Sequence, residues 1–372
     1  MQGGGSLGAY ECGVYKALEK QGIRLDIVAG TSIGALNAAI IVGSKTNSPA
    51  QNLEQFWLTL AENITPTFLP DNIRSIYSSM FAAAYGNPNT FEPIWLSPYN
   101  SFNYYSNFKS SDYLIPHLYD TRPLKKTLSK FIDFDKINSY QGTINIKNGK
   151  DKDIRKGSSN IPRLIVTSTD IQRSESVTFD NKYMKLDEDH IVACAGFPFY
   201  GIAWTYKDGL YLWDGSLLSN TPLREVIDAS PKNDKRVYIV NLFPRYQEDL
   251  PRNIFDAWHR ARDIIHTDKT DHNIRISKVI SKYLSLMRQM HDVLNNVQID
   301  EGMRDLYLQI EKEYHRLAGD RGTIIDKIIK IERTEDIHFI FEDADFSIAT
   351  IKKLIKQGEE DAENVLAEKR NK

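Results

Sequence analysis

The stretch LDIVAGTSIGALNAAIIV, residues 25–42, gives the strongest indication of the fold. Residues 25–29 have the apolar pattern of a short buried strand, and residues 35–42 have the small and apolar side chains of a buried helix. Between them, Gly30 and Gly34 flank Thr31-Ser32-Ile33 and permit a tight bend that exposes the Ser32 hydroxyl. The positive end of the following helix lies next to that hydroxyl. Strand-to-helix turns also favour Gly, Thr and Ser for structural reasons, so this turn alone assigns no function.

A second glycine-rich run, Gly3-Gly4-Gly5-Ser6-Leu7-Gly8, lies upstream of this turn. A helix expected over residues 9–21 and the strand at residues 25–29 separate the two. Because one strand–helix–strand unit places successive turns at the carboxyl edge of a sheet, we expect the glycine run and Ser32 to lie side by side. Glycine-rich turns usually follow a strand, and only Met1 and Gln2 precede this one. We therefore expect the natural reading frame to begin upstream, or this chain to have low stability and activity.

The rest of the chain alternates between strands and helices and then becomes helical. Residues 253–318 have a helical pattern throughout, a strand is expected at 337–341, and Ser347 is expected to cap a final charged helix. We expect an α/β domain over residues 1–243, with a sheet of mixed or mainly parallel order, and a mostly helical extension over residues 244–372. The later strands of the sheet are expected at residues 163–169, 175–179, 210–213 and 237–243.

The composition excludes several classes of protein. The 372 residues include 41% hydrophobic and 26% charged side chains, which are ordinary globular values and exclude extensive disorder. With 47 Lys and Arg against 49 Asp and Glu, the net charge of −2 gives no electrostatic reason to expect nucleic acid as a partner. Cys12 and Cys194 are too few for a disulfide framework or a thiolate metal site. The apolar run at 35–42 is too short to span a bilayer and follows no basic segment, so we expect a soluble, cytoplasmic chain.

The glycine run admits two chemical interpretations. Gly3-x-Gly5-x-x-Gly8 matches a dinucleotide-binding fingerprint, which needs an acidic residue about 20 residues on, at the end of the second strand. Asp26 has nearly that spacing but lies at the start of its strand, which is the wrong end. Alternatively, free backbone N–H groups of such a loop stabilise a developing oxyanion, as acyl transfer requires. A nucleotide-binding α/β protein thus stands beside an acyl-transfer enzyme as an alternative.

A catalytic serine needs a base, and Asp214-Gly215-Ser216 offers a candidate. An Asp-Gly pair after a strand is commonly the tip of a hairpin. An aspartate at a strand end, buried near Trp213, would instead have a pKa suited to accepting a proton. The eight histidines lie apart from the glycine turns, on helices, in an aromatic stretch or in a late strand. A Ser–Asp–His order like that of an α/β-hydrolase esterase can be written with a late histidine and is the second choice.

Taken together, the three motifs resemble those of the patatin-like phospholipase family. Its members have a Gly-Gly-Gly-x-x-Gly oxyanion loop, a Gly-x-Ser-x-Gly nucleophile turn and a later Asp-Gly-Gly or Asp-Gly-Ala motif, in the order found here. The resemblance covers about residues 1–243, including residues 219–222, and residues 345–347 resemble the C-terminal extension of a bacterial subgroup. It implies a three-layer α/β fold with a mainly parallel central sheet, followed by a mostly helical extension.

The resemblance also implies a serine acyl hydrolase that needs neither cofactor nor metal. Ser32 is the implied nucleophile, and Asp214 is the implied general base, which takes the hydroxyl proton and later activates water. Phospholipid or lysophospholipid esters, met in transient contact with a membrane surface, are the implied substrates, and a free fatty acid is the product. The oxyanion is stabilised by backbone N–H groups among Gly3, Gly4, Gly5, Ser6, Leu7 and Gly8. The other residues of the two catalytic motifs are Gly30, Thr31, Ile33, Gly34, Gly215 and Ser216.

Two motif positions depart from the family's usual pattern. Leu7 stands where many members have Arg or Lys, which bears on headgroup preference, and Ser216 replaces the usual Gly or Ala. The aromatic stretch at 91–119 is expected to be a lid, an acyl-chain wall or an interfacial anchor, with filler of an irregular insertion as the alternative. A catalytically inactive scaffold, whose helical half binds a partner, is a further alternative.

Overall fold

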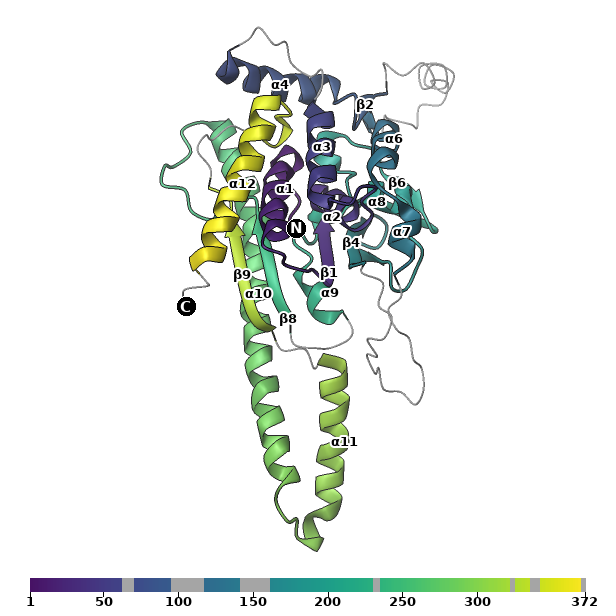
Figure 1. Cartoon of the computed structure of the whole chain (residues 1–372), viewed down its shortest axis with the longest axis vertical. Helices are drawn as coiled ribbons and strands as arrows, with labels where there is room; N and C mark the ends of the chain where they lie inside the picture. The colour runs from purple at the N-terminus through teal and green to yellow at the C-terminus, as the bar shows by residue number, and fades with distance from the viewer. Residues whose placement is uncertain are drawn as a thin grey trace.

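A five-stranded sheet lies at the centre of the molecule (Figure 1). β1 pairs with β4 in parallel, whereas β5 and β7 pair with β4, and β6 pairs with β7, in antiparallel order. These strands are β1 (Ile27–Thr31), β4 (Arg163–Asp170), β5 (Glu175–Asp180), β6 (Thr205–Lys207) and β7 (Leu210–Asp214). The computed structural model describes residues 1–61, 70–94, 117–140, 161–229, 235–321, 325–334 and 342–368.

Two pairs of strands lie outside this sheet. They are β2 (Glu92–Pro93) with β3 (Tyr119–Asp120), antiparallel, and β8 (Lys235–Asn241) with β9 (Ile325–Glu332), parallel. The helices before β8 are α1 (Gly8–Lys20), α2 (Ile33–Val42), α3 (Pro49–Ala61), α4 (Asp71–Tyr85), α6 (Arg122–Phe131), α7 (Phe134–Asn138), α8 (Glu188–Ala193) and α9 (Leu223–Asp228). The later helices are α10 (Ile254–Asn295), α11 (Arg304–Arg321) and α12 (Ile348–Glu368). Short 3₁₀ turns are η1 (Gly5–Leu7), η2 (Pro198–Tyr200), η3 (Gly215–Leu217), η4 (Glu301–Met303) and η5 (Glu342–Ala344).

Helices cover both faces of the sheet. Val28 of β1 and Leu164 of β4 belong to the main core, which α1, α2, α3 and α12 complete. Ala29 and Ile165, the next residue along each strand, pack instead with Val226 of α9. Because successive side chains of a strand point to opposite faces, this alternation gives a helix–sheet–helix arrangement of three layers.

The last helix, α12, packs along α1 from the opposite end of the chain (Figure 1). A Cβ atom at Gly358 would lie 2.0 Å from the Tyr10 carbonyl oxygen, so this approach requires glycine. The Tyr10 hydroxyl donates a hydrogen bond of 2.9 Å to Asp361. Ile351 and Leu354 of α12 are buried in the main core. The end of the chain therefore shares its core with the residues that follow the glycine run.

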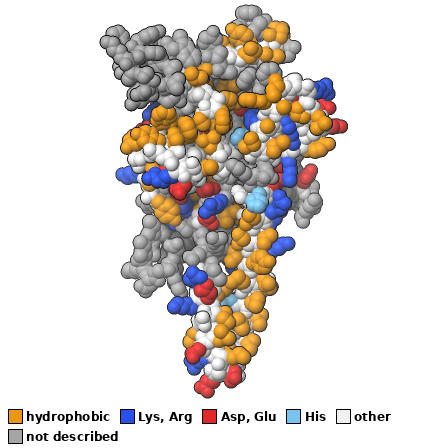
Figure 2. Space-filling model, turned by 180° about the vertical axis from the view of Figure 1, so that it is seen from behind, with side chains coloured by type: hydrophobic (Ala, Val, Ile, Leu, Met, Phe, Trp, Pro, Cys, Tyr) orange, Lys and Arg blue, Asp and Glu red, His pale blue; other side chains and the backbone are white. Residues whose placement is uncertain are grey.

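Helices α10 and α11 form a hairpin that extends away from the sheet (Figure 1). In the view from behind, hydrophobic side chains run along the hairpin (Figure 2). Val279, Tyr283, Leu286 and Met290 are among the exposed ones. None of the described helices combines the length and the apolar character needed to span a membrane.

The α/β class and the helical C-terminal part expected from the sequence are confirmed. Parallel order holds for the pairs β1–β4 and β8–β9, and the sheet as a whole is mixed. The helical pattern expected over 253–318 is confirmed as two helices, α10 and α11, with a turn between them at residues 296–303. The strand expected at 237–243 is present as β8, but it lies outside the five-stranded sheet and pairs in parallel with β9, for which the sequence pattern predicts no strand. The strand expected at 337–341 and the aromatic residues 95–116 lie outside the described residues, and the domain boundary after residue 243 stays a prediction.

Candidate active site

Ser32 and Asp214 lie in direct contact, although they are far apart in the sequence. The Ser32 hydroxyl donates a hydrogen bond of 2.6 Å to Oδ2 of Asp214. Ser32 directly follows β1 and Asp214 is the last residue of β7, and both strands pair with β4: Thr31 pairs with Thr167, and Asp214 pairs with Ser168. The sheet topology thus brings the two motifs to neighbouring positions on one central strand.

The backbone of Ser32 is held in a strained conformation between β1 and α2. Its φ of 54° and ψ of −129° are unusual for a residue with a side chain. A Cβ atom at Gly30 would lie 2.0 Å from the Gly34 carbonyl oxygen, so the bend closes only with glycine there. Ser32 is partly exposed, whereas every residue of α2 is buried. The sharp turn therefore presents the hydroxyl at the end of an otherwise buried segment.

Asp214 is fully buried, and its carboxylate is oriented by the backbone. Oδ1 accepts a hydrogen bond of 2.8 Å from the Ser216 N–H, which leaves Oδ2 for Ser32. Burial raises the pKa of Asp214 to about 6, and the hydrogen bonds from Ser32 and Ser216 oppose this shift. Asp214-Gly215 is not a hairpin tip: β6 and β7 are joined through Asp208-Gly209, and η3 follows Asp214.

The glycine run lies beside the nucleophile, as expected. A Cβ atom at Gly3 would lie 2.8 Å from Cβ of Ser32. Gly3 donates through its N–H to the Asn220 carbonyl oxygen, and its own carbonyl accepts from the Asn220 side chain. The N–H groups of Leu7 and Gly8 donate to carbonyl oxygens within the run. Within the described part of the chain, no hydrogen bond is found for the N–H groups of Gly4, Gly5 and Ser6.

The remaining motif residues support the two turns. The Thr31 hydroxyl lies 2.7 Å from that of Thr167 and donates to the Ser219 carbonyl oxygen. Three glycines lie where a Cβ atom would be too close to a neighbour. Gly8 lies against Ile33, Gly34 against the backbone of Met1 and Gln2, and Gly215 against Thr167. The structure therefore brings all the candidate site residues into one region.

Sequence reasoning missed three residues that contact this region. They are Asn220, which fixes Gly3; Glu11, which is buried under the glycine run; and Asp343, whose carbonyl oxygen lies against Gly5. Glu11 accepts hydrogen bonds from the Gln2 N–H and the Asn37 side chain, and burial raises its pKa to about 7. The family resemblance includes residues 219–222 but implies no role for Asn220.

Histidine takes no part in this arrangement in the part of the chain that the structure describes. His190 is buried but caps α8 and contacts Asp187 and Asp208. His338 lies outside the described residues. His291 and His315 lie with Glu311 in the α10–α11 hairpin, where their ligand atoms are close enough to share a metal ion. That group belongs to the hairpin and not to the Ser32–Asp214 pair.

Comparisons with known proteins identify the family of this chain. A family model described as patatin-like phospholipase matches residues 1–227. A lysophospholipase, nte1, from Aspergillus terreus is 58% identical over 38 residues, which are 10% of this chain and 2% of that protein. The crystal structure of VipD from Legionella pneumophila aligns over 99% of this chain and 66% of its own, with 15% identity and a TM-score of 0.38, too low to support an assignment. Because this match covers more than half of the chain, the chain belongs to the patatin-like phospholipase family, a family of lipid ester hydrolases.

Proposed function

We propose that this protein is a serine acyl hydrolase that cleaves fatty-acyl esters of phospholipids or lysophospholipids through a Ser–Asp dyad. The observation that carries the proposal is the 2.6 Å hydrogen bond from Ser32 to the buried Asp214. A carboxylate with a pKa of about 6 is ionised at neutral pH and is still basic enough to accept a proton from the hydroxyl in the transition state.

The reaction proceeds in two steps on these residues. In the first, Oγ of Ser32 attacks the ester carbonyl carbon while its proton passes to Asp214, and the leaving alcohol departs with a proton from that carboxyl. This step leaves an acyl-serine ester. In the second, Asp214 takes a proton from water while the water oxygen attacks the acyl carbon. The bond from the acyl carbon to Oγ of Ser32 then breaks, Asp214 returns the proton to Oγ, and the fatty acid leaves.

The tetrahedral oxyanion needs hydrogen-bond donors at its position in both steps. The N–H groups of Gly4, Gly5 and Ser6 are the candidates in the glycine loop, because those of Gly3, Leu7 and Gly8 donate to carbonyl oxygens. The number of candidate N–H donors in the loop therefore falls from six to three. No cofactor or metal enters these steps.

Membrane lipid as the substrate is supported by the family and by the surface beside the dyad. The matched relative is named a lysophospholipase. Phe199 is 81% exposed and lies in η2 beside Tyr200, whose hydroxyl donates to Asp343 of η5, the turn that packs on the glycine loop. Leu218, directly after η3, is exposed as well. Apolar side chains at this place suit transient contact with a lipid surface.

A fluorophosphonate probe tests the proposal directly. We expect covalent labelling of the wild-type chain at Ser32, loss of labelling in Ser32→Ala, and loss of ester hydrolysis in both Ser32→Ala and Asp214→Asn. His190→Gln is the control, because His190 is buried but does not contact the dyad, and it should remain active. Full hydrolysis in Ser32→Ala or Asp214→Asn would refute the dyad, and a wild-type chain that neither labels nor hydrolyses would favour the inactive scaffold.

The other two alternatives have less support. A Ser–Asp–His triad would need a histidine in contact with Asp214, and within the described residues the Asp214 carboxylate bonds only to Ser32 and Ser216. The activity of histidine variants tests this alternative. A nucleotide site lacks its acidic residue, because Asp26 precedes β1 and lies at the end of the strand opposite Ser32. Titration with NAD or ATP should therefore leave the melting temperature unchanged.

A further inference from the structure

The outer wall of the glycine loop is formed by a segment from near the end of the chain. This segment is η5, residues 342–344, and it packs on η1 of the loop. A Cβ atom at Gly5 would lie 2.2 Å from the Asp343 carbonyl oxygen, so the two backbones are in direct contact. The Ser6 hydroxyl donates a hydrogen bond of 3.0 Å to the Glu342 carbonyl oxygen. Gly5 has a φ of 55°, a conformation that glycine adopts at little cost and that leaves its position to be fixed by neighbours.

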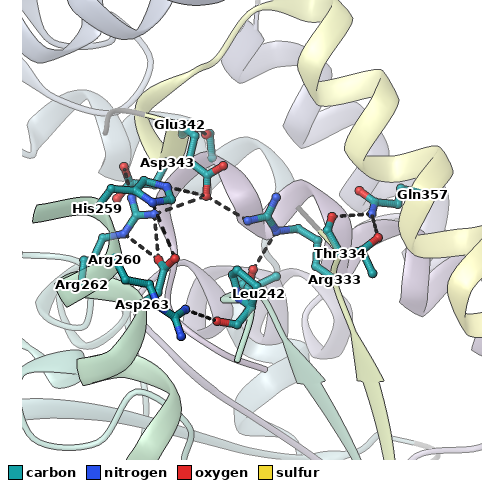
Figure 3. A network of polar contacts seen from close by, with 12 residues as sticks. Leu242, His259, Arg260, Arg262, Asp263, Arg333, Thr334, Glu342, Asp343 and Gln357 are labelled. Atoms are coloured by element: carbon teal, nitrogen blue, oxygen red, sulfur yellow. Dashed lines mark hydrogen bonds and ion pairs between the residues drawn. The ribbon is translucent and has the colours of Figure 1, made fainter. Parts of the chain in front are cut away.

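Two arginines hold η5 in place (Figure 3). Arg333, which follows β9, donates two hydrogen bonds. One, of 2.9 Å, runs from Nη2 to the Glu342 carboxylate, and the other, of 2.7 Å, runs from Nε to the Leu242 carbonyl oxygen. Leu242 is itself the side chain against Gly4, where a Cβ atom would lie 2.8 Å from its Cδ1. Arg333 therefore ties η5 to the residue that supports the next position of the loop.

Arg262 of α10 makes the second connection. Its Nη1 lies 3.0 Å from Oδ1 of Asp343, and its Nη2 lies 3.3 Å from Glu342 and 3.0 Å from Asp263. The guanidinium also stacks over the Phe243 ring at 5.1 Å. The side chains of these acids are at most 13% exposed. A buried guanidinium with three carboxylates has few alternative positions, so the connection is rigid.

A third connection runs to the side of the general base. The Tyr200 hydroxyl donates a hydrogen bond of 2.5 Å to Oδ2 of Asp343, and burial raises the pKa of that hydroxyl well above its usual value. Tyr200 lies in η2, a few residues after Gly196, whose carbonyl oxygen accepts the Asp214 N–H. Asp343 thus contacts both the loop that would stabilise the oxyanion and η2, which follows the residue bonded to Asp214.

We propose that Asp343, fixed by Arg262 and Tyr200, is a positioning residue of the oxyanion loop, so that the C-terminal part of the chain completes the active site. This inference rests on the proposed function. Donors of an oxyanion hole must lie at hydrogen-bonding distance from the developing charge. A small displacement of one donor therefore reduces the stabilisation of the transition state more than the binding of the substrate. The side chain of Asp343 acts through its own backbone, whose carbonyl sets the place of Gly5.

Asp343→Asn tests the inference with little change of shape. It keeps an acceptor for Tyr200 and removes the charge that pairs with Arg262. With p-nitrophenyl butyrate as substrate, we expect kcat to fall about tenfold or more and KM to change less than twofold, because the loss falls on the transition state. Labelling by a fluorophosphonate, whose phosphoryl oxygen occupies the same oxyanion position, should slow in parallel. Tyr200→Phe and Ser6→Ala should give the same pattern with smaller losses.

Asp180→Asn is the matched control. Asp180 and Asp343 are both 7% exposed, and Asp180 pairs with the buried Arg163 between β4 and β5, away from the loop. If loss of a buried ion pair only loosens the fold, Asp180→Asn and Asp343→Asn will lower the melting temperature and the activity alike. We expect instead that the control loses stability without the kcat effect, measured well below both melting temperatures.

The outcomes separate this inference from the proposed function. An active wild-type chain with an unchanged kcat in Asp343→Asn overturns the positioning role and leaves the dyad intact. An equal fall of kcat in Asp180→Asn overturns it too. A wild-type chain that neither hydrolyses the ester nor labels at Ser32 refutes the proposed function itself, and the inference with it.

Discussion

At the scale of the residue, the chemistry depends on the charge of one buried carboxyl. Asp214 must be ionised to accept the Ser32 proton, and burial raises its pKa to about 6. We expect kcat/KM to rise with pH through about 6 and then to level off, since this ratio reports the free enzyme. The measurement is hydrolysis of a neutral ester from pH 4.5 to 8.5. A flat profile across that range would contradict Asp214 as the base.

The same carboxyl should cost the protein stability. The folded pKa of about 6 lies above the ordinary aspartate value of 3.8, so the folded state favours the protonated form, and stability falls as pH rises from about 4 to about 6. Asp214→Asn keeps an acceptor for the Ser216 N–H and removes the charge. We expect it to raise the free energy of unfolding by up to about 3 kcal/mol at pH 7.5 and by little at pH 4. Urea unfolding at both pH values measures this, and destabilisation at pH 7.5 would argue against the buried charge.

At the scale of the element, the contact of α1 with α12 holds the helix that follows the glycine loop. Gly358 lies where a Cβ atom would meet the Tyr10 carbonyl oxygen at 2.0 Å. Gly358→Ala should therefore force the helices apart and lower the free energy of unfolding by about 1–3 kcal/mol. Gly302→Ala is the control, because a Cβ atom there would meet only Asp300, at 3.9 Å. Equal melting temperatures for the two variants would show that the crossing tolerates the methyl group.

At the scale of the whole molecule, two apolar regions compete as the lipid contact. One is η2 with the exposed Phe199; its neighbour Tyr200 bonds to Asp343 of η5. The other is the hairpin of α10 and α11 (Figure 2). We expect Phe199→Ser to weaken binding to phosphatidylcholine vesicles and hydrolysis of vesicle lipid several-fold, while hydrolysis of a soluble ester is unchanged. Leu306→Ser, in the hairpin and 56% exposed, is the matched control. Loss of binding in the control alone would move the contact to the hairpin.

Metal removal is a second test of the whole molecule. Because the proposed steps use only a carboxylate, a hydroxyl and backbone N–H groups, EDTA should leave ester hydrolysis unchanged. The described group that could hold an ion, His291 with Glu311 and His315, lies in the hairpin. A loss of hydrolysis with EDTA that persists in His315→Ala would point to a metal at the dyad and contradict the proposed mechanism.

Local sequence determined the elements around the nucleophile. The apolar runs on either side of Ser32 and the glycines around it predict the strand, the sharp turn and helix α2, because these depend on side-chain pattern and backbone sterics within a few residues. The order of the three motifs indicated the family, which the family model confirms. Residues 325–332 contain four isoleucines and four charged residues without strict alternation, and β9 was identified only through its pairing with β8.

Only the tertiary structure decided what surrounds the dyad. The sequence placed Asp214 at a strand end, but its distance from Ser32 and its burial follow from β1 and β7 flanking β4. Asn220 and Asp343 carry no local signal for their contacts with Gly3 and Gly5, since such contacts join segments from distant parts of the chain. The sequence by itself determined which groups could react, because chemistry resides in residue types at short spacing. The fold decided where those groups lie and how strongly each is desolvated, because long-range packing sets both.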